Sequence, residues 1–202
     1  MNKPVKLVHG IGVNDAEQPI SEGGKVCKAY TLWSGMLLRC TNVWWLRHPT
    51  YNGVTCSENF KSYTYFCKWR DKQTGGNEKD KDGTSWQLDK DLLVRGNKLY
   101  SEDTCCFIPK RINLLLIKRD KLRGNCLIGA CYNNINNTFI SQCNNGTGKQ
   151  TYLGSFKTAQ EAFQAYKTFK ESLIKEVANE YKEMLDSRVY EALMNYEVNE
   201  ND

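Results

Sequence analysis

Hydrophobic residues recur every three or four positions in four parts of the chain, and this spacing predicts amphipathic helices. The first helix is expected from Lys28 to Arg39. A second helical segment ends near Trp69, and its aromatic side chains are interpreted as core residues. Thr158 and Glu161 have the spacing of a capping box, so a long helix is expected to begin beside them, and a short one is expected at about 187–195. The apolar stripe of the long helix comprises Phe163, Tyr166, Phe169, Leu173, Val177, Tyr181 and Met184.

The middle of the chain carries most of the candidate chemistry. Residues 71–85 are rich in Gly, Lys and Asp without periodicity, which indicates an exposed loop. A strand at 86–88 is expected next, and it ends at Asp89. A second short strand is expected to run into a helix that begins at Pro109, because proline suits the first helical position. Asn113 lies in the first turns of that helix, so this order can bring Asp89 and Asn113 to one divalent cation.

The charge distribution limits where a nucleic acid could bind. The 202 residues include 28 Lys and Arg against 23 Asp and Glu, a net charge of +5. From Lys182 onward there are two bases and six acids, a net charge of −4, so the preceding residues carry +9. The body before Lys182 is therefore the candidate DNA surface. The chain has no apolar run of about 18 residues and no apolar signal core, which predicts a soluble cytoplasmic protein without a membrane partner.

The cysteines form no recognisable motif. The chain has nine of them at irregular spacings and without a Cys-x-x-Cys pair, and this pattern favours small buried thiols. A structural zinc site is the less favoured alternative, with Cys40, Cys56, Cys67 and Cys105 as its ligands. A disulfide framework is favoured least, since no secretion signal is present.

Four motifs in the first half of the chain resemble phage-encoded HNH-like homing endonucleases. They are Trp33-x-x-Met36-Leu37-x-Arg39-Cys40, Pro49-Thr50-Tyr51-x-Gly53-Val54, Leu88-Asp89-Lys90-Asp91 and Tyr100-Ser101-x-x-Thr104-Cys105. The resemblance implies a ββα-metal core and a single Mg²⁺ or Mn²⁺ ion held by Asp89 and Asn113. Asp91 is either a further ligand or a partner of Lys90. Thr104 stands where many members of the family have a structural Asn.

Lys90 departs from the HNH pattern because it occupies the place of the catalytic His, which is the general base. A solvated lysine has a pKa of about 10.4, so half-neutralising a lysine near pH 7 costs about 4 kcal/mol. Lys90 is either a base with a lowered pKa or a charged contact to the scissile phosphate. His48, in a loop before a proline, is a less favoured substitute. The residues expected to hold the DNA strand are Arg95, Lys98, Lys110 and Arg111.

Residues from about 124 to 181 resemble the Apetala-two type of DNA-binding domain, in which three antiparallel strands pack on one helix. The strongest match is the phrase Tyr152-Leu153-Gly154-Ser155-Phe156-Lys157-Thr158-x-x-Glu161-Ala162-Phe163-x-Ala165-Tyr166. The resemblance implies strands at 126–133, 138–144 and 151–156, joined by Asn-rich and Gly-rich turns that suit hairpins. The sheet face opposite the helix would read DNA. Alternation assigns to it Tyr132, Asn134, Thr138, Ile140, Gln142 and Lys149, although a register error of one residue would exchange the faces.

Together these patterns predict an α+β fold. Residues 1–80 are expected to form an N-terminal arm and a helical support region, residues 81–122 the HNH-like hairpin, and residues 123–202 the DNA-binding module with its C-terminal helices. The predicted function is a DNA endonuclease that hydrolyses phosphodiester bonds in double-stranded DNA, as a monomer or a homodimer. The alternative is an inactive relative that binds DNA as a regulator or acts against a host defence protein. A third possibility is a structural or protein-binding phage factor.

Overall fold

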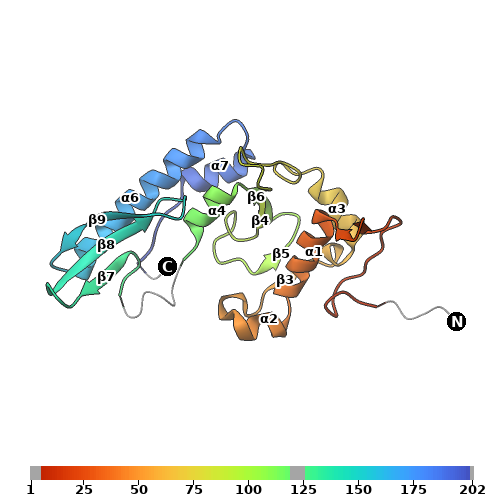
Figure 1. Cartoon of the computed structure of the whole chain (residues 1–202), viewed down its shortest axis with the longest axis horizontal. Helices are drawn as coiled ribbons and strands as arrows, with labels where there is room; N and C mark the ends of the chain where they lie inside the picture. The colour runs from red at the N-terminus through yellow and green to blue at the C-terminus, as the bar shows by residue number, and fades with distance from the viewer. Residues whose placement is uncertain (1–5, 119–125, 201–202) are drawn as a thin grey trace. The chain divides into compact units, whose positions relative to one another are not determined.

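The computed structural model describes residues 6–118 and 126–200, and it has the mixed α+β fold that the sequence predicted (Figure 1). The chain forms two compact units. The first comprises Met1–Lys79 and Leu88–Phe107, and the second comprises Asp80–Gln87 and Ile108–Asp202. Each unit is therefore built from two stretches of sequence.

Short helices dominate the first unit. Helix α1 spans Lys28–Arg39, as predicted, and is followed by α2 at Asn42–Arg47 and α3 at Tyr63–Arg70. Two 3₁₀ turns, η1 at Pro49–Tyr51 and η2 at Asn59–Lys61, connect them. Hydroxyl side chains define the starts of α2 and α3, because Thr41 accepts a hydrogen bond from the backbone of Trp44 and Ser62 accepts one from that of Tyr65.

Aromatic residues fill the core of this unit. Trp33 on α1 is fully buried, and its indole N–H donates to the carbonyl of Phe60 at 2.8 Å. The ring of Phe60 meets that of Phe66 edge-on at 5.3 Å, and it lies 4.7 Å from that of Trp69. The interpretation of the aromatic segment before residue 70 as core is confirmed.

The strands of this part of the chain are short. β1 (Ser21–Glu22) and β2 (Lys25–Val26) form an antiparallel pair, and β3 (Thr55–Cys56) pairs in parallel with β5 (Leu99–Tyr100). β4 (Gln87–Asp89) and β6 (Cys106–Ile108) form another two-stranded sheet, and the division between the units falls within these two strands. β4 begins one residue later than predicted and includes Asp89.

A three-stranded antiparallel sheet and a long helix make up most of the second unit (Figure 1). The sheet order is β7 (Ala130–Asn133), β8 (Thr138–Asn144) and β9 (Gln150–Phe156). β8 has its predicted bounds, and β9 is one residue longer than predicted. The expectation that the first strand begins at Cys126 is wrong. Gly129 has a φ of +76°, and Ala130 donates to the carbonyl of Leu127 in a turn, which delays the strand.

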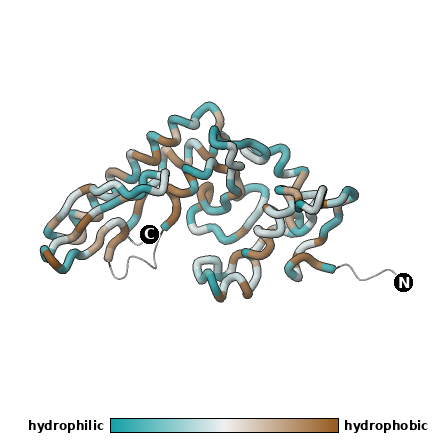
Figure 2. Tube along the Cα trace, viewed as in Figure 1, coloured by the Kyte–Doolittle hydropathy of each residue, from teal (hydrophilic) through white to brown (hydrophobic). Residues whose placement is uncertain are grey.

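Helix α6 (Ala159–Glu180) begins with the predicted capping box, in which Thr158 and Glu161 each accept a hydrogen bond from the other's backbone. Figure 2 shows hydrophobic residues recurring along its length. The predicted stripe extends too far, because the helix ends at Glu180 and Met184 lies beyond it at 44% exposure. Helix α7 (Ser187–Met194) follows.

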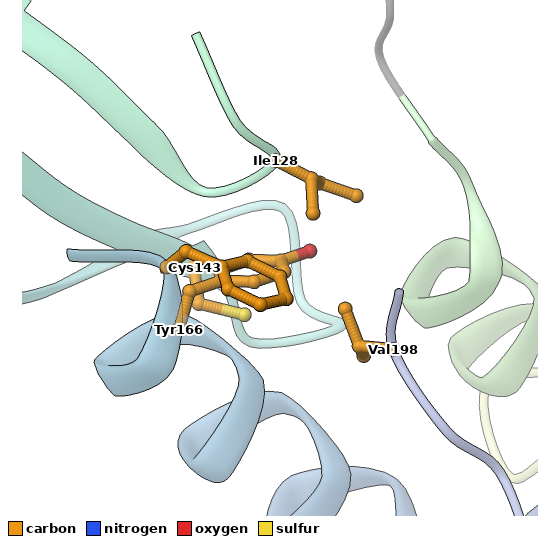
Figure 3. Close-up of a cluster of buried hydrophobic side chains, with 5 residues drawn as sticks. Ile128, Cys143, Tyr166 and Val198 are labelled. Atoms are coloured by element: carbon orange, nitrogen blue, oxygen red, sulfur yellow. The ribbon is translucent and has the colours of Figure 1, made fainter. Parts of the chain in front are cut away.

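The core of the second unit lies between the sheet and α6. Figure 3 shows part of it, a cluster formed by Ile128, Cys143, Phe163, Tyr166 and Val198. Helix α4 (Lys110–Leu116) also belongs to this unit, and Pro109 precedes it as the cap residue rather than as its first residue. Within the described ranges, every helix is too short or too polar to cross a membrane.

Candidate metal and DNA sites

The end of β4 turns sharply around the side chain of Asp89. One carboxylate oxygen, Oδ1, accepts hydrogen bonds from the backbone N–H groups of Asp91 at 2.9 Å and Leu92 at 2.8 Å. Burial raises the pKa of Asp89, and the nearby charge of Asp91 raises it further. The turn therefore holds a half-buried carboxylate in one orientation, and a cation beside it would relieve the cost of its burial.

Lys90 is clamped inside the loop that follows. The residue is only 8% exposed, and its ammonium group donates to Asp91 Oδ2 at 2.9 Å and to the carbonyl of Asn97 at 3.1 Å. It also lies over the ring of Tyr51, 5.9 Å from the centroid. Because a carboxylate and a carbonyl can only accept, this geometry suits a protonated lysine that donates rather than a base that receives a proton.

Asn97 closes the same loop from its other end. Its amide group donates to the carbonyls of Lys90 at 2.6 Å and Leu99 at 2.7 Å, and its oxygen accepts from the backbone N–H of Leu99 at 3.1 Å. The loop from residue 90 to residue 97 is thus held by reciprocal bonds between its two ends. Sequence reasoning assigned neither Asn97 nor Tyr51 to the site, although Tyr51 lies in one of the four motifs.

Replacing Lys90 with Met is expected to lower the free energy of unfolding by about 1–3 kcal/mol, because the substitution removes the donor to the Asn97 carbonyl. The ion pair with the half-exposed Asp91 adds little after solvent screening. Urea denaturation followed by circular dichroism measures the change. Lys81→Met at an exposed loop position is the matched control, and we expect it to change stability by less than about 0.5 kcal/mol. Equal effects of the two substitutions would contradict the clamp.

Asn113 lies on α4 and is half-buried. Its side-chain amide N–H donates to the side-chain oxygen of Gln87. This bond orients the amide and leaves Asn113 Oδ1 as the side-chain atom that could accept a hydrogen bond or contact a cation. Asn113 belongs to the second unit and Asp89 to the first, so the sharing of one ion between them stays a prediction. Among residues 6–118 and 126–200, no group of three or more His, Cys, Asp or Glu side chains is arranged to hold a metal ion.

The basic residues expected on the DNA strand differ in their surroundings. Arg95 and Lys110 are exposed. Lys98 is exposed as well, and its ammonium group donates to the carbonyl of Asn52 at 2.6 Å. Arg111 forms an ion pair with Glu180 on α6, so contact with a phosphate would have to compete with that carboxylate.

The two histidines make local contacts. His48 stacks on Trp44 with a centroid separation of 4.0 Å, and its ring lies 6.5 Å from that of Tyr51, which in turn lies below the Lys90 ammonium. The Nε2 atom of His9 is 2.9 Å from Ser34 Oγ. His48 is therefore the histidine separated from the Lys90 loop by a single aromatic ring.

The strand register corrects the predicted DNA-reading face. Tyr132 pairs with Phe139 rather than with Thr138, so it shares a face with Ser141 and Cys143, the face covered by α6. Thr138, Ile140 and Gln142 lie on the opposite face, as predicted. Asn134 follows the end of β7, and Lys149 precedes the start of β9, so both belong to turns. The β7 residues on the open face are Cys131 and Asn133.

The four cysteines of the alternative zinc site, which are Cys40, Cys56, Cys67 and Cys105, do not all contact the same neighbours. The thiol of Cys40 donates to the carbonyl of Met36 at 3.4 Å, and the neighbouring thiol of Cys56, together with burial, raises the pKa of Cys40. Cys67 instead hydrogen-bonds to Tyr63, whose hydroxyl also lies 3.2 Å from the thiol of Cys27. Burial raises the pKa of Cys105 to about 12. All nine cysteines are free thiols.

Comparison with protein-family models, curated proteins and solved structures finds no match to this chain.

Proposed function

We propose that this chain is a metal-dependent endonuclease that hydrolyses phosphodiester bonds in double-stranded DNA, of the HNH-like kind that phages encode. The observation that carries the proposal is the order of β4, β6 and α4, with Asp89 at the end of the first strand and Asn113 on the helix. Two paired strands followed by a helix are the elements that a ββα-metal core requires.

The side chains around this order support a cation site. Asp89 offers a carboxylate oxygen at the end of β4. Asn113 hydrogen-bonds to Gln87 through its N–H group and so keeps its oxygen as a ligand. Carboxylate and amide oxygens suit Mg²⁺ or Mn²⁺, which usually keep several water ligands beside one or two protein ligands. When bound, such an ion would polarise a phosphoryl oxygen and stabilise the charge that develops on it.

Lys90 fits the role of a charge that orients the loop and attracts the phosphate. Its ammonium group has three N–H donors, and Asp91 and the Asn97 carbonyl account for two of them. Arg95 and Lys98, exposed in the same unit, are proposed to hold the neighbouring backbone. Lys110 and Arg111 are assigned the same role on α4. Asp91 is assigned to Lys90 as its ion-pair partner, and its further role as a metal ligand stays a prediction.

The three-stranded sheet is proposed to bind the DNA duplex. Its open face carries Gln142, Tyr152 and Ser155, which are exposed, together with Thr138 and Ile140. Amide and hydroxyl side chains on a strand can hydrogen-bond to base edges in the major groove. Lys149 lies in the exposed turn between β8 and β9, where it can contact a phosphate.

Incubation of supercoiled plasmid with the wild-type protein in Mg²⁺, in Mn²⁺ and in EDTA tests the proposal. We expect nicking or linearisation in either metal and none in EDTA. Asn113→Ala is expected to reduce the cleavage rate at least about tenfold, since one metal ligand is lost. Asn42→Ala, at an exposed position of α2, is the matched control and should retain activity. Full activity in Asn113→Ala would contradict the metal assignment.

The clamped state of Lys90 favours a second candidate, an inactive relative that binds DNA as a regulator or acts against a defence protein. An ammonium group held by Asp91 and Asn97 is poorly placed to act as a general base. This candidate predicts a salt-sensitive mobility shift of DNA without cleavage in any divalent cation. The plasmid assay and the mobility shift together distinguish the two candidates.

A further inference from the structure

The second unit contains a cavity of about 120 Å³ beside the end of β8. Its polar lining comes from Gln142 and Asn144 on β8, Gln150 on β9, and Tyr166 and Lys170 on α6. Ile128 and residues of α4 and its C-terminal end complete it with apolar side chains. The cavity adjoins the core cluster in Figure 3, where Tyr166 and Ile128 are labelled.

Lys170 is the unusual member of this lining. It is 5% exposed and lies on the buried face of α6, in line with Tyr166 and Ile174. Among the residues that the structure describes, none accepts a hydrogen bond from its ammonium group or forms an ion pair with it. Its titratable neighbour is the thiol of Cys143, and burial lowers the pKa of Lys170. A buried ammonium group without a counter-charge costs several kcal/mol, so such groups are normally paired.

The other polar groups of the cavity are suited to an anion. Each of the three amide side chains carries an NH₂ group with two donors. The oxygen of Asn144 already accepts from the backbone N–H of Gly146 at 2.7 Å, so this side chain presents its NH₂ group. No carboxylate contributes to the described lining. An ammonium group together with several N–H donors matches a ligand that has several acceptor oxygens and a negative charge.

We propose that this cavity binds a small oxyanion of the phosphate type, with Lys170 as its counter-charge and the amides of Asn144 and Gln150 as hydrogen-bond donors. The site is separate from the endonuclease proposal and does not depend on it. At 5% exposure, Lys170 is too enclosed to meet the backbone of a DNA duplex, so the ligand is a free ion or a small molecule.

Thermal unfolding in increasing inorganic phosphate, at constant ionic strength maintained with chloride, tests the proposal. The wild-type midpoint is expected to rise and then saturate, because a ligand that binds only the folded state stabilises it. Lys170→Met should abolish the saturable rise. Lys175→Met, at an exposed position of the same helix, is the matched control and should retain it.

A second variant keeps the test decisive if Lys170→Met does not fold. Gln150→Leu changes an exposed strand residue and removes one donor, so phosphate binding measured by calorimetry should weaken several-fold. An unchanged saturable rise in Lys170→Met would overturn the proposal. The absence of saturable binding of phosphate or sulfate to the wild-type protein would overturn it as well, and would mean that Lys170 is buried as a neutral amine.

Discussion

Asp89→Ala is expected to lower the rate of metal-dependent DNA cleavage at least about 100-fold, which corresponds to about 2.7 kcal/mol of transition-state stabilisation. The reason is that Asp89 is the one charged ligand that the proposal assigns to the cation, and an ion that neutralises a developing phosphoryl charge contributes several kcal/mol. Initial rates of plasmid nicking in Mg²⁺ and Mn²⁺ measure the effect, and a mobility shift checks that DNA binding is retained.

Two further substitutions distinguish the loss of a metal ligand from the disruption of the backbone turn around Asp89. Asp89→Asn keeps an oxygen that can accept from Asp91 and Leu92 but removes the negative charge, so it should retain the fold and still lose most of the activity. Asp103→Ala, at an exposed position in the same region of sequence, is the matched control and should cleave at the wild-type rate. Wild-type cleavage by Asp89→Asn would contradict the assignment of Asp89 as the charged ligand of the cation, whatever the behaviour of the Ala variant.

The helices were predictable because their signals are local. The stripe in α1 and the capping box of α6 lie within a few residues of the elements that they define, and both were assigned correctly. The end of α6 was not, because Tyr181 continues the apolar spacing past Glu180. Its hydroxyl instead bonds to the Asp80 carboxylate, a residue about 100 positions away in the sequence. Such a contact leaves no local pattern.

The faces of the sheet depended on register, which alternation alone does not determine. The predicted faces were assigned by simple alternation along each strand. This put Tyr132 on the same face of the sheet as Thr138 and Gln142. The actual pairing joins Tyr132 to Phe139, and an irregularity between Ser141 and Gln142 shifts the register with β9. A one-residue shift moves a side chain to the opposite face.

The candidate site was predictable in its order but not in its internal contacts. The resemblance predicted roles for Asp89, Lys90 and Asn113, whereas the contacts of Lys90 with Asn97 and Tyr51, and of Asn113 with Gln87, were not predicted. These partners come from segments whose proximity depends on the fold. The burial of Lys170 also has a weak pattern in the sequence. This residue lies four positions after Tyr166 and four before Ile174, and so on the same face of the helix. A lysine within an apolar stripe indicates a buried charge.

Gly129→Ala is expected to lower the free energy of unfolding by about 2–5 kcal/mol. Gly129 has a φ of +76°, where a side chain costs about 1–2 kcal/mol. An added Cβ would also overlap the ring of Tyr166, a buried core residue, and overpacking of this kind costs about 1–3 kcal/mol. Chemical denaturation followed by circular dichroism measures the change.

Gly148 offers a matched control within the same unit. Its φ of +87° imposes the same backbone cost, but an added Cβ would meet no atom within 4 Å. Gly148→Ala should therefore destabilise the protein by only about 1–2 kcal/mol. The difference of about 2 kcal/mol between the two variants isolates the contact of the turn with Tyr166. Tyr166 belongs to the core cluster and also lines the Lys170 cavity. Equal destabilisation by Gly129→Ala and Gly148→Ala would mean that Gly129 does not pack against the ring of Tyr166 as the structure shows.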